Sequence, residues 1–234
     1  MKSRWQLHIV SHTHWDREWY QSFQQFRIKL VEVIDGVLDL LDSDSGFCYF
    51  MLDGQTVVLE DYLEIKPQQR ERLANHIRSG RLDIGPWYVS PDLFLTSAES
   101  TVRNLMLGHR LSQEFGAAMK VGYLPDVFGH ISQMPQILRG FGIDSAVIYR
   151  GVGPEATKTE FSWEASDSSQ VLAIYLPDGY CHAANLPSAS AMAWEKVQAL
   201  VERLAPLATT KNLLLLNGCD HLMPQKELPQ IIST

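Results

Sequence analysis

The sequence predicts an α/β fold: a mostly parallel seven-stranded sheet, or a distorted β/α barrel, with helices on the outside. Short apolar runs of strand length alternate along the chain with stretches in which apolar residues recur every three or four positions. This alternation is typical of parallel strands joined by crossover helices. Ionisable side chains follow directly after several of the apolar runs. Because ligands bind where the carboxyl ends of such strands meet, the pattern also predicts which edge of the sheet carries a site.

Seven short apolar runs give the predicted strands. They lie at residues 5–10, 47–52, 81–86, 120–124, 144–149, 169–176 and 212–216. Their length and composition suit strands that are buried on both faces. One segment departs from the alternation, because in residues 161–176 two β-prone stretches flank the polar sequence SDSS. We therefore expect a β-hairpin there instead of a crossover helix.

Three stretches have the periodicity of helices that cover a sheet. Their apolar stripes run from Phe26 to Leu41, from Val102 to Leu111 and from Trp194 to Leu204. Thr96 and Glu99 have the spacing of a capping box, which predicts that the second helix begins there.

We expect one α/β domain spanning residues 1–234, because a chain of this length buries a single core and no linker or repeat interrupts the pattern. After the last predicted strand the sequence offers only QKELPQIIST, which is too short for the helix that should cover that strand. We therefore expect either that the sheet ends there or that the domain is the N-terminal part of a longer protein.

The composition narrows the class of partner and the compartment. The 20 Lys and Arg against 27 Asp and Glu give a net charge of −7, without a dense basic cluster. This argues against nucleic acid, since phosphate binding needs concentrated positive charge. No apolar run approaches the roughly 18 residues of a membrane span, and the first residues do not resemble a signal peptide. We expect a cytoplasmic protein that has no membrane or nucleic-acid partner.

The three cysteines, Cys48, Cys181 and Cys219, are an odd number without CxxC spacing. Such a pattern indicates neither a disulfide framework nor a cysteine-based zinc site, and a reducing compartment fits it.

The first predicted strand is followed by SHTHWDREWY, residues 11–20. In an extended segment His14 and Asp16 point the same way and can both reach one cation. Imidazole with carboxylate suits zinc, and manganese or another divalent ion is the alternative. A lone H-x-D is more often a surface accident or a hydrogen-bonded pair. Further carboxylates at the same edge favour a metal site.

Two such carboxylates follow later strands: Asp126 in GYLPDVFGH and Asp220 in NGCDH. Each alone would be interpreted as a turn or helix-capping residue. Together they supply the pair that glycoside hydrolysis requires, one to attack or activate water and one to protonate the leaving group.

Cationic and aromatic side chains complete the candidate set. Arg150 follows a predicted strand. It is either a structural ion-pair partner or a group that holds the nucleophile charged or binds a substrate anion. Trp19 and Trp87 lie after the first and third predicted strands. Aromatic residues at such positions are more often packing residues, yet their faces also suit stacking against a sugar ring.

Six ordered motifs resemble the N-terminal catalytic region of the α-mannosidases of glycoside hydrolase family 38, especially their bacterial mannosylglycerate-hydrolase type. The motifs are HTHWDREW, LDGQTVVLEDY, GPWYVSPD, AESTVRNLMLGHR, GYLPDVFGHISQMPQIL and NGCDH. The resemblance extends from about residue 5 to residue 222, which is nearly the whole chain.

The resemblance implies a retaining, two-step hydrolysis of a small carbohydrate that carries a terminal α-mannose, such as mannosylglycerate or its phosphorylated form. It implies one zinc ion per site, held by His14, Asp16 and Asp126. Asp126 is then also the nucleophile, and Asp220 matches the acid/base residue. Trp19 is implied to lie under the sugar, and Phe128 and Arg150 to line the same pocket.

The family's fourth zinc ligand is a histidine in a later H-D motif, which this sequence does not contain. The family's helical bundle and β-sandwich domains are not represented either. We therefore expect weak or absent activity from the 234-residue chain alone. Two alternatives stay open: a metal-dependent carbohydrate deacetylase, and a truncated non-catalytic remnant that binds sugar or metal.

Overall fold

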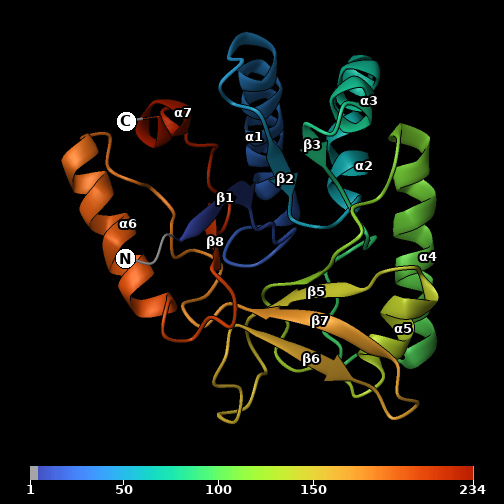
Figure 1. Ribbon diagram of the computed structural model, residues 1–234. Helices are drawn as coiled ribbons and strands as arrows, with labels where there is room; N and C mark the ends of the chain where they lie inside the picture. The colour runs from blue at the N-terminus through green and yellow to red at the C-terminus, as the bar shows by residue number, and fades with distance from the viewer. Residues whose placement is uncertain (1–4, 234) are drawn as a thin grey trace.

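The computed structural model describes residues 5–233, in which eight strands form two four-stranded sheets (Figure 1). In the first sheet the order is β3 (Leu82–Asp83), β2 (Phe50–Leu52), β1 (Gln6–Thr13), β8 (Asn212–Asn217), and all pairs are parallel. In the second the order is β4 (Gly122–Leu124), β5 (Ser145–Ile148), β7 (Gln170–Tyr175), β6 (Glu160–Glu164). Here β6 alone is antiparallel to its neighbour.

Backbone hydrogen bonds connect the two sheets at both edges of the first sheet. After β3, Ile84 O accepts from Met119 N at 2.9 Å, just before β4. At the opposite edge, Ala183 N donates to Leu216 O of β8 at 3.1 Å. The strands therefore follow one another around an incompletely closed barrel, and the predicted α/β class with mostly parallel strands is confirmed.

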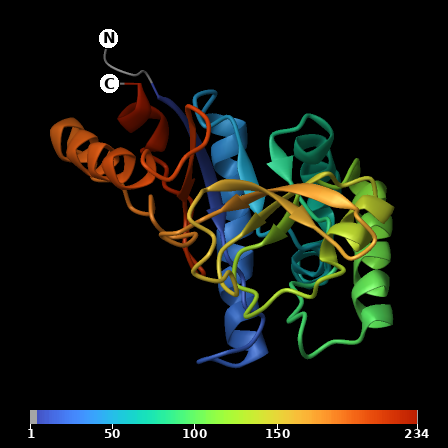
Figure 2. The same cartoon turned by 60° about the horizontal axis from the view of Figure 1, so that its bottom comes forward.

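The helices lie around the outside of the strands in both views of the chain (Figures 1 and 2). They are α1 (Phe23–Ser43), α2 (Val57–Leu63), the 3-10 helix η1 (Pro67–Gln69), α3 (Arg70–Arg78), α4 (Ala98–Phe115), α5 (Met134–Gly140), α6 (Ser190–Leu204) and α7 (Leu228–Ile232). No helix within residues 5–233 is long and apolar enough to cross a membrane.

All seven predicted strands are present, and the predicted hairpin is confirmed. Its strands are β6 and β7, paired from Glu160↔Ile174 to Glu164↔Gln170. The predicted helices correspond to α1, α4 and α6.

The start of α4 differs by one residue from the prediction. The N-cap is Ser97, whose hydroxyl accepts from Ser100 N at 3.1 Å. The Thr96 hydroxyl instead donates to Asp92 O of the preceding turn, at 3.1 Å. The sequence TSAES offers two candidate caps in succession, and the competing turn decides between them.

The main core lies between α1 and the first sheet. The stripe of α1 is fully buried and packs with β2, α2 and α3 in one apolar cluster. On α6 the residues Val197, Leu200 and Leu204 are buried, but Trp194, predicted in the same stripe, is 60% exposed. The apolar face of α6 is therefore narrower than the sequence pattern suggested.

The cysteine prediction was wrong for two of the three residues. Cys181 and Cys219 form a disulfide, with their Cα atoms 4.7 Å apart, and Cys48 is free and exposed. Cys181 follows β7 and Cys219 follows β8, so the bond links the second sheet to the β8 edge of the first. The two residues lie 38 positions apart in the sequence, and only the folding of the sheets brings them together.

Candidate active site

The end of β1 delivers His14 into the site, beside the turn that follows β8. His14 and Asp220 form an isolated parallel bridge just beyond the paired strands, and His14 N donates to Cys219 O at 3.2 Å. A Cβ at Gly218 would collide with His12 O. Only glycine therefore lets this turn pass close enough to β1 to place Asp220 next to His14.

His14 is buried and has a carboxylate on each side of its ring. Its Nδ1 lies 2.9 Å from Asp53 Oδ1, and its Nε2 lies 3.6 Å from Asp16 Oδ1 and 3.9 Å from Asp126 Oδ2. Burial alone would lower the pKa of His14, but the charges of Asp53 and Asp16 outweigh it and raise that pKa well above its usual value. The same imidazole lowers the pKa of Asp16.

Asp126 comes from the second sheet, directly after β4, and pairs with Arg150, which follows β5. Arg150 Nε donates to Asp126 Oδ1, and its guanidinium carbon lies 5.0 Å from the centre of the Phe128 ring. A Cβ at Gly151, where φ is +71°, would collide with Gly129. The two loops approach through these glycines, which places Arg150 against the carboxylate.

Asp220 is connected to the other candidates by Tyr180, a residue of the segment after β7. The Tyr180 hydroxyl donates to Asp220 Oδ1 at 2.9 Å, and its ring centre lies 5.1 Å from that of His14. Burial, together with the charges of Asp126 and Asp220, raises the pKa of Tyr180 far above its usual value. The hydroxyl therefore stays protonated and acts as a donor.

His14, Asp16 and Asp126 fit a zinc site in the type of their donor atoms and in their distances from the imidazole. Two ligands of one zinc ion can be at most about 4.2 Å apart, since each bond is about 2.1 Å long. Both distances from His14 Nε2 fall below that limit, at 3.6 and 3.9 Å. Among residues 5–233, however, only Cys181, Cys219 and Asp220 place three ligand-type atoms within 4.8 Å of one another, so the Asp16 and Asp126 oxygens are too far apart to share one zinc ion unless a side chain shifts. Since those two sulfurs are bonded to each other, they offer no thiolate.

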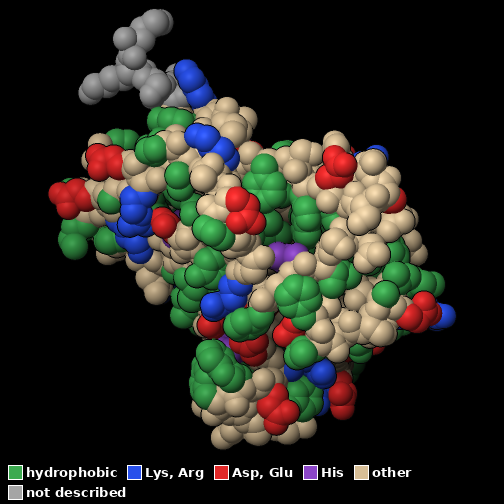
Figure 3. Space-filling view, turned by 90° about the horizontal axis from the view of Figure 1, so that it is seen from below, with side chains coloured by type: hydrophobic (Ala, Val, Ile, Leu, Met, Phe, Trp, Pro, Cys, Tyr) green, Lys and Arg blue, Asp and Glu red, His purple; other side chains and the backbone are tan. Residues whose placement is uncertain are grey.

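A cavity of about 640 Å³ contains His14, Asp16, Asp126 and Phe128 in its wall. Residues 89–92, in the loop between β3 and α4, also line this cavity. On the face seen in Figure 3, acidic, basic and hydrophobic side chains are interspersed.

The predicted aromatic residues have different environments. Trp19 and Phe128 are 66% and 65% exposed, so their rings are accessible to a ligand. Trp87 is only 1% exposed, and its indole N–H donates to Tyr123 O at 2.9 Å. Trp87 therefore packs in the core, and its position argues against the substrate-binding role predicted for it.

Three residues at the site carry roles that the sequence did not indicate. Asp53 binds the ring of His14, Tyr180 binds Asp220, and His221 Nε2 accepts from Asp16 N at 3.1 Å. Asp53 follows a predicted strand, which was the one available signal. A tyrosine in a loop and a histidine beside a candidate aspartate carry no signal of their own.

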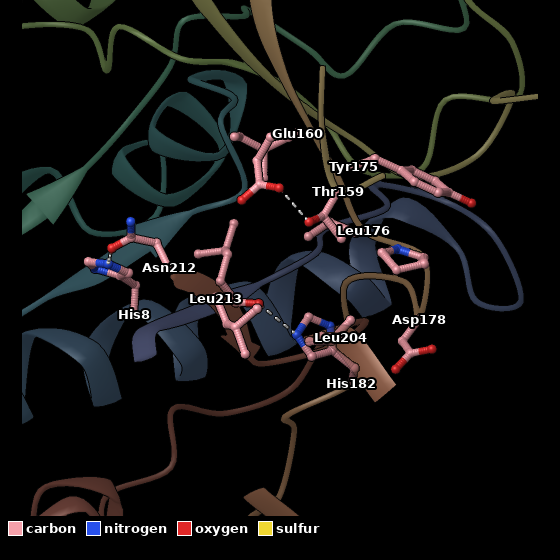
Figure 4. A pocket seen from close by; sticks show the side chains of 13 residues that line it. His8, Thr159, Glu160, Tyr175, Leu176, Asp178, His182, Leu204, Asn212 and Leu213 are labelled. Atoms are coloured by element: carbon pink, nitrogen blue, oxygen red, sulfur yellow. Dashed lines mark hydrogen bonds between the residues drawn. The ribbon is translucent and has the colours of Figure 1, made fainter. Parts of the chain in front are cut away.

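A second cavity, of about 240 Å³, lies where β8 faces the end of β7 (Figure 4). Its histidines are already engaged: His8 Nε2 lies 2.9 Å from Asn212 Oδ1, and His182 Nε2 lies 3.2 Å from Leu214 O. Its lining includes none of the residues that line the first cavity. The candidate chemistry is therefore concentrated at the first cavity.

Comparison with known families gives one match over almost the whole chain. Residues 4–233 match the model described as the glycosyl hydrolases family 38 N-terminal domain. A protein of Halalkalibacterium halodurans, named "Putative mannosylglycerate hydrolase", is 42% identical over 96% of this chain. Alpha-mannosidase G of Dictyostelium discoideum is 28% identical over 75% of the chain.

Among solved structures, an alpha-mannosidase from Enterococcus faecalis V583 superposes with a TM-score of 0.95, at 36% identity over 98% of this chain. The chain covers 26% of that structure, 27% of the Halalkalibacterium protein and 16% of the Dictyostelium protein. It thus spans about a quarter or less of the length of these relatives.

Proposed function

The chain belongs to glycosyl hydrolase family 38, and from that premise we propose that it is the catalytic α/β domain of a retaining α-mannosidase. The observation that carries the proposal is the convergence of His14, Asp16 and Asp126 at one cavity, with Asp220 reached through Tyr180. The substrate class is a small carbohydrate with a terminal α-mannose. Mannosylglycerate or its phosphorylated form is the candidate, because the Halalkalibacterium relative carries that name.

In the first step the Asp126 carboxylate attacks the anomeric carbon, while Asp220 gives its proton to the departing glycosidic oxygen. This forms a mannosyl ester on Asp126 and releases the aglycone as an alcohol. In the second step Asp220 removes a proton from water, which attacks the same carbon and restores the Asp126 carboxylate. Two inversions at one carbon retain the configuration of the sugar.

The other side chains orient these groups. Arg150 occupies Oδ1 of Asp126, so that Oδ2 is the oxygen on the side of His14. Phe128 lines the cavity and offers an exposed aromatic face to the sugar, whereas Trp19 is exposed but is not among the lining residues, so its contact with the sugar rests on the family resemblance. A zinc ion held by His14 Nε2, Asp16 and Asp126 would orient the sugar hydroxyls and stabilise developing charge electrostatically. Another divalent ion could fill the same role.

Mass spectrometry with an activated fluoromannosyl fluoride tests the nucleophile without requiring turnover. We expect the reagent to label the peptide that contains Asp126, and Asp126→Asn to stay unlabelled with an unchanged fold. Any hydrolysis of an aryl α-mannoside should fall by about 10³-fold or more in that variant, the order expected when a covalent nucleophile is lost. Undiminished turnover by Asp126→Asn, or a label on another residue, would contradict the assignment.

We expect weak or absent turnover by residues 1–234 when they are assayed alone, because three ligands hold a metal ion less tightly than four. A cytoplasmic location and the absence of nucleic-acid and membrane partners belong to the same proposal and rest on composition. The Cys181–Cys219 disulfide counts against a cytoplasmic location, since such bonds are more usual in oxidising compartments.

The alternative function, a deacetylase, predicts acetate release from an N-acetylated sugar without glycosidic cleavage, and the same assay mixtures detect it.

A further inference from the structure

Asp53 lies buried at the end of β2 and accepts three hydrogen bonds. Its Oδ1 accepts from His14 Nδ1 at 2.9 Å, and its Oδ2 accepts from Trp15 N and from Gln55 Nε2, both at 2.7 Å. We propose that Asp53 is the positioning residue for His14, holding the proton of the neutral imidazole on Nδ1 and keeping Nε2 free for the metal ion. This inference rests on the proposed metal site.

The chemistry of the two groups fixes the direction of the bond. A carboxylate can only accept, so the imidazole nitrogen that it contacts is the one that carries the proton. The other nitrogen, Nε2, then has a free lone pair on the side of Asp16 and Asp126. A second partner that fixes the ring and its tautomer is what metal-binding histidines generally have.

The backbone of Asp53 gives independent support. Its φ is +50°, in the left-handed region that residues other than glycine rarely adopt. Gln55, which donates to the Asp53 carboxylate, is itself held by two further hydrogen bonds. Its amide donates to Trp15 O at 2.8 Å and accepts from Ser90 N at 3.2 Å. Strained backbone that is held in place by several partners is characteristic of functional sites.

Asp53→Asn is the informative variant, since asparagine keeps the shape and tolerates the left-handed backbone. Its single carbonyl oxygen can satisfy either His14 or the two donors Trp15 N and Gln55 Nε2. We expect the oxygen to stay with the two donors, which turns the NH₂ group toward His14. That group donates to Nδ1, so the ring proton moves to Nε2 and blocks the metal-binding nitrogen.

Zinc titration of the whole chain by calorimetry tests the consequence. We expect Asp53→Asn to bind Zn²⁺ about 10–100-fold more weakly than the wild type, with the far-UV circular dichroism unchanged. Asp42→Asn is the matched control, because it removes a carboxylate that lies 2.8 Å from another histidine nitrogen, His76 Nε2, outside the site. Equal affinity in the wild type and Asp53→Asn would overturn the inference.

Nitrogen NMR of the His14 ring, recorded at alkaline pH where the ring is neutral, separates this inference from the proposed function. The expected wild-type spectrum shows Nδ1 protonated, with a shift of the proton toward Nε2 in Asp53→Asn. If the wild type binds no zinc but shows this tautomer, the metal site falls and the positioning role stands. If Asp53→Asn does not fold, the wild-type spectrum decides alone, and a proton on Nε2 overturns the role.

Discussion

At the scale of single residues, each candidate reacting group has one atom fixed by a neighbour. Tyr180 binds Asp220 Oδ1, Arg150 binds Asp126 Oδ1 and Asp53 binds His14 Nδ1. A hydrogen bond to one oxygen or nitrogen of a side chain restricts rotation of the whole group. The other oxygen or nitrogen is therefore held in place before a substrate arrives.

Removing the hydroxyl of Tyr180 should weaken proton donation by Asp220. Tyr180→Phe keeps the ring against His14 but deletes the donor. We expect mannosides with poor leaving groups, which need that proton, to react about tenfold or more slowly, while those with good leaving groups change little. The measurement is kcat/KM across aryl mannosides of graded leaving-group pKa.

Tyr62→Phe is the control for this experiment, because it deletes a tyrosine–aspartate bond of 2.6 Å, to Asp35, outside the site. A uniform loss across all leaving groups in Tyr180→Phe would mean that the tyrosine supports the fold and does not orient the acid.

The sequence located the candidate residues better than it located their partners. His14, Asp16, Asp126 and Asp220 follow strands, and the topology of an α/β fold gathers such positions at one edge. Asp53 occupies an equivalent position, yet no pattern distinguishes a residue that orients a histidine from one that ends a turn. The substrate-binding role predicted for Trp87 was wrong because Trp87 is buried against residues of α4 and β4, which follow it later in the chain.

At the scale of elements, the strands and the long helices could be predicted because their periodicity is local. The division into two sheets could not be predicted, because it depends on tertiary structure. β3 and β4 are consecutive strands in the chain, yet each forms the edge of a different sheet. Ser22 and Gln25 form a capping box at the start of α1 that equally follows from local sequence.

Glu160, the first residue of β6, is predicted to stabilise the edge between the sheets in a pH-dependent way. Its carboxylate accepts from Thr159 Oγ1 at 2.7 Å, Thr209 N at 2.8 Å and Thr210 Oγ1 at 3.0 Å. Burial would raise its pKa, but these hydrogen bonds outweigh that effect and lower the pKa below the ordinary 4.5. The stabilisation is therefore present above pH 4.5 and lost as the pH falls through the folded-state value.

We expect Glu160→Gln to lower the free energy of unfolding by about 1–2 kcal/mol at pH 7. The difference from the wild type should shrink below pH 4.5. Urea unfolding at pH 7 and at acidic pH measures it. The control is Glu164→Gln at the exposed end of the same strand, where the carboxylate accepts from Gln170. A difference that does not change with pH would contradict the prediction.

At the scale of the whole molecule, the site is built across two sheets. His14 and Asp220 follow β1 and β8 of the first sheet, whereas Asp126 and Tyr180 follow β4 and β7 of the second. The Cys181–Cys219 disulfide joins the same two sheets, and its cysteines directly follow Tyr180 and precede Asp220. The relative position of the sheets therefore determines the distance and orientation between Asp126 and Asp220, the proposed nucleophile and acid/base residue.

Breaking this bond should destabilise the fold. Cys181→Ser releases a loop of 38 residues, and closing a loop of that size is expected to contribute about 2–4 kcal/mol. Urea unfolding with and without dithiothreitol measures the loss, with the exposed Cys48→Ser as control. Three free thiols in the unreduced protein, counted by mass spectrometry after alkylation, would contradict the pairing.

The pairing of β1 with β8 has a consequence for synthesis of the chain. Gln6 aligns with Asn212 and Ser11 with Asn217, so one edge of β1 finds its partner only after some two hundred further residues have been made. Until then the growing polypeptide exposes an apolar strand edge on the ribosome, which invites association with other chains. Contacts of such long sequence separation also slow folding. His14, which follows β1, therefore reaches its final position in the site only after β8 has been made and has paired with β1.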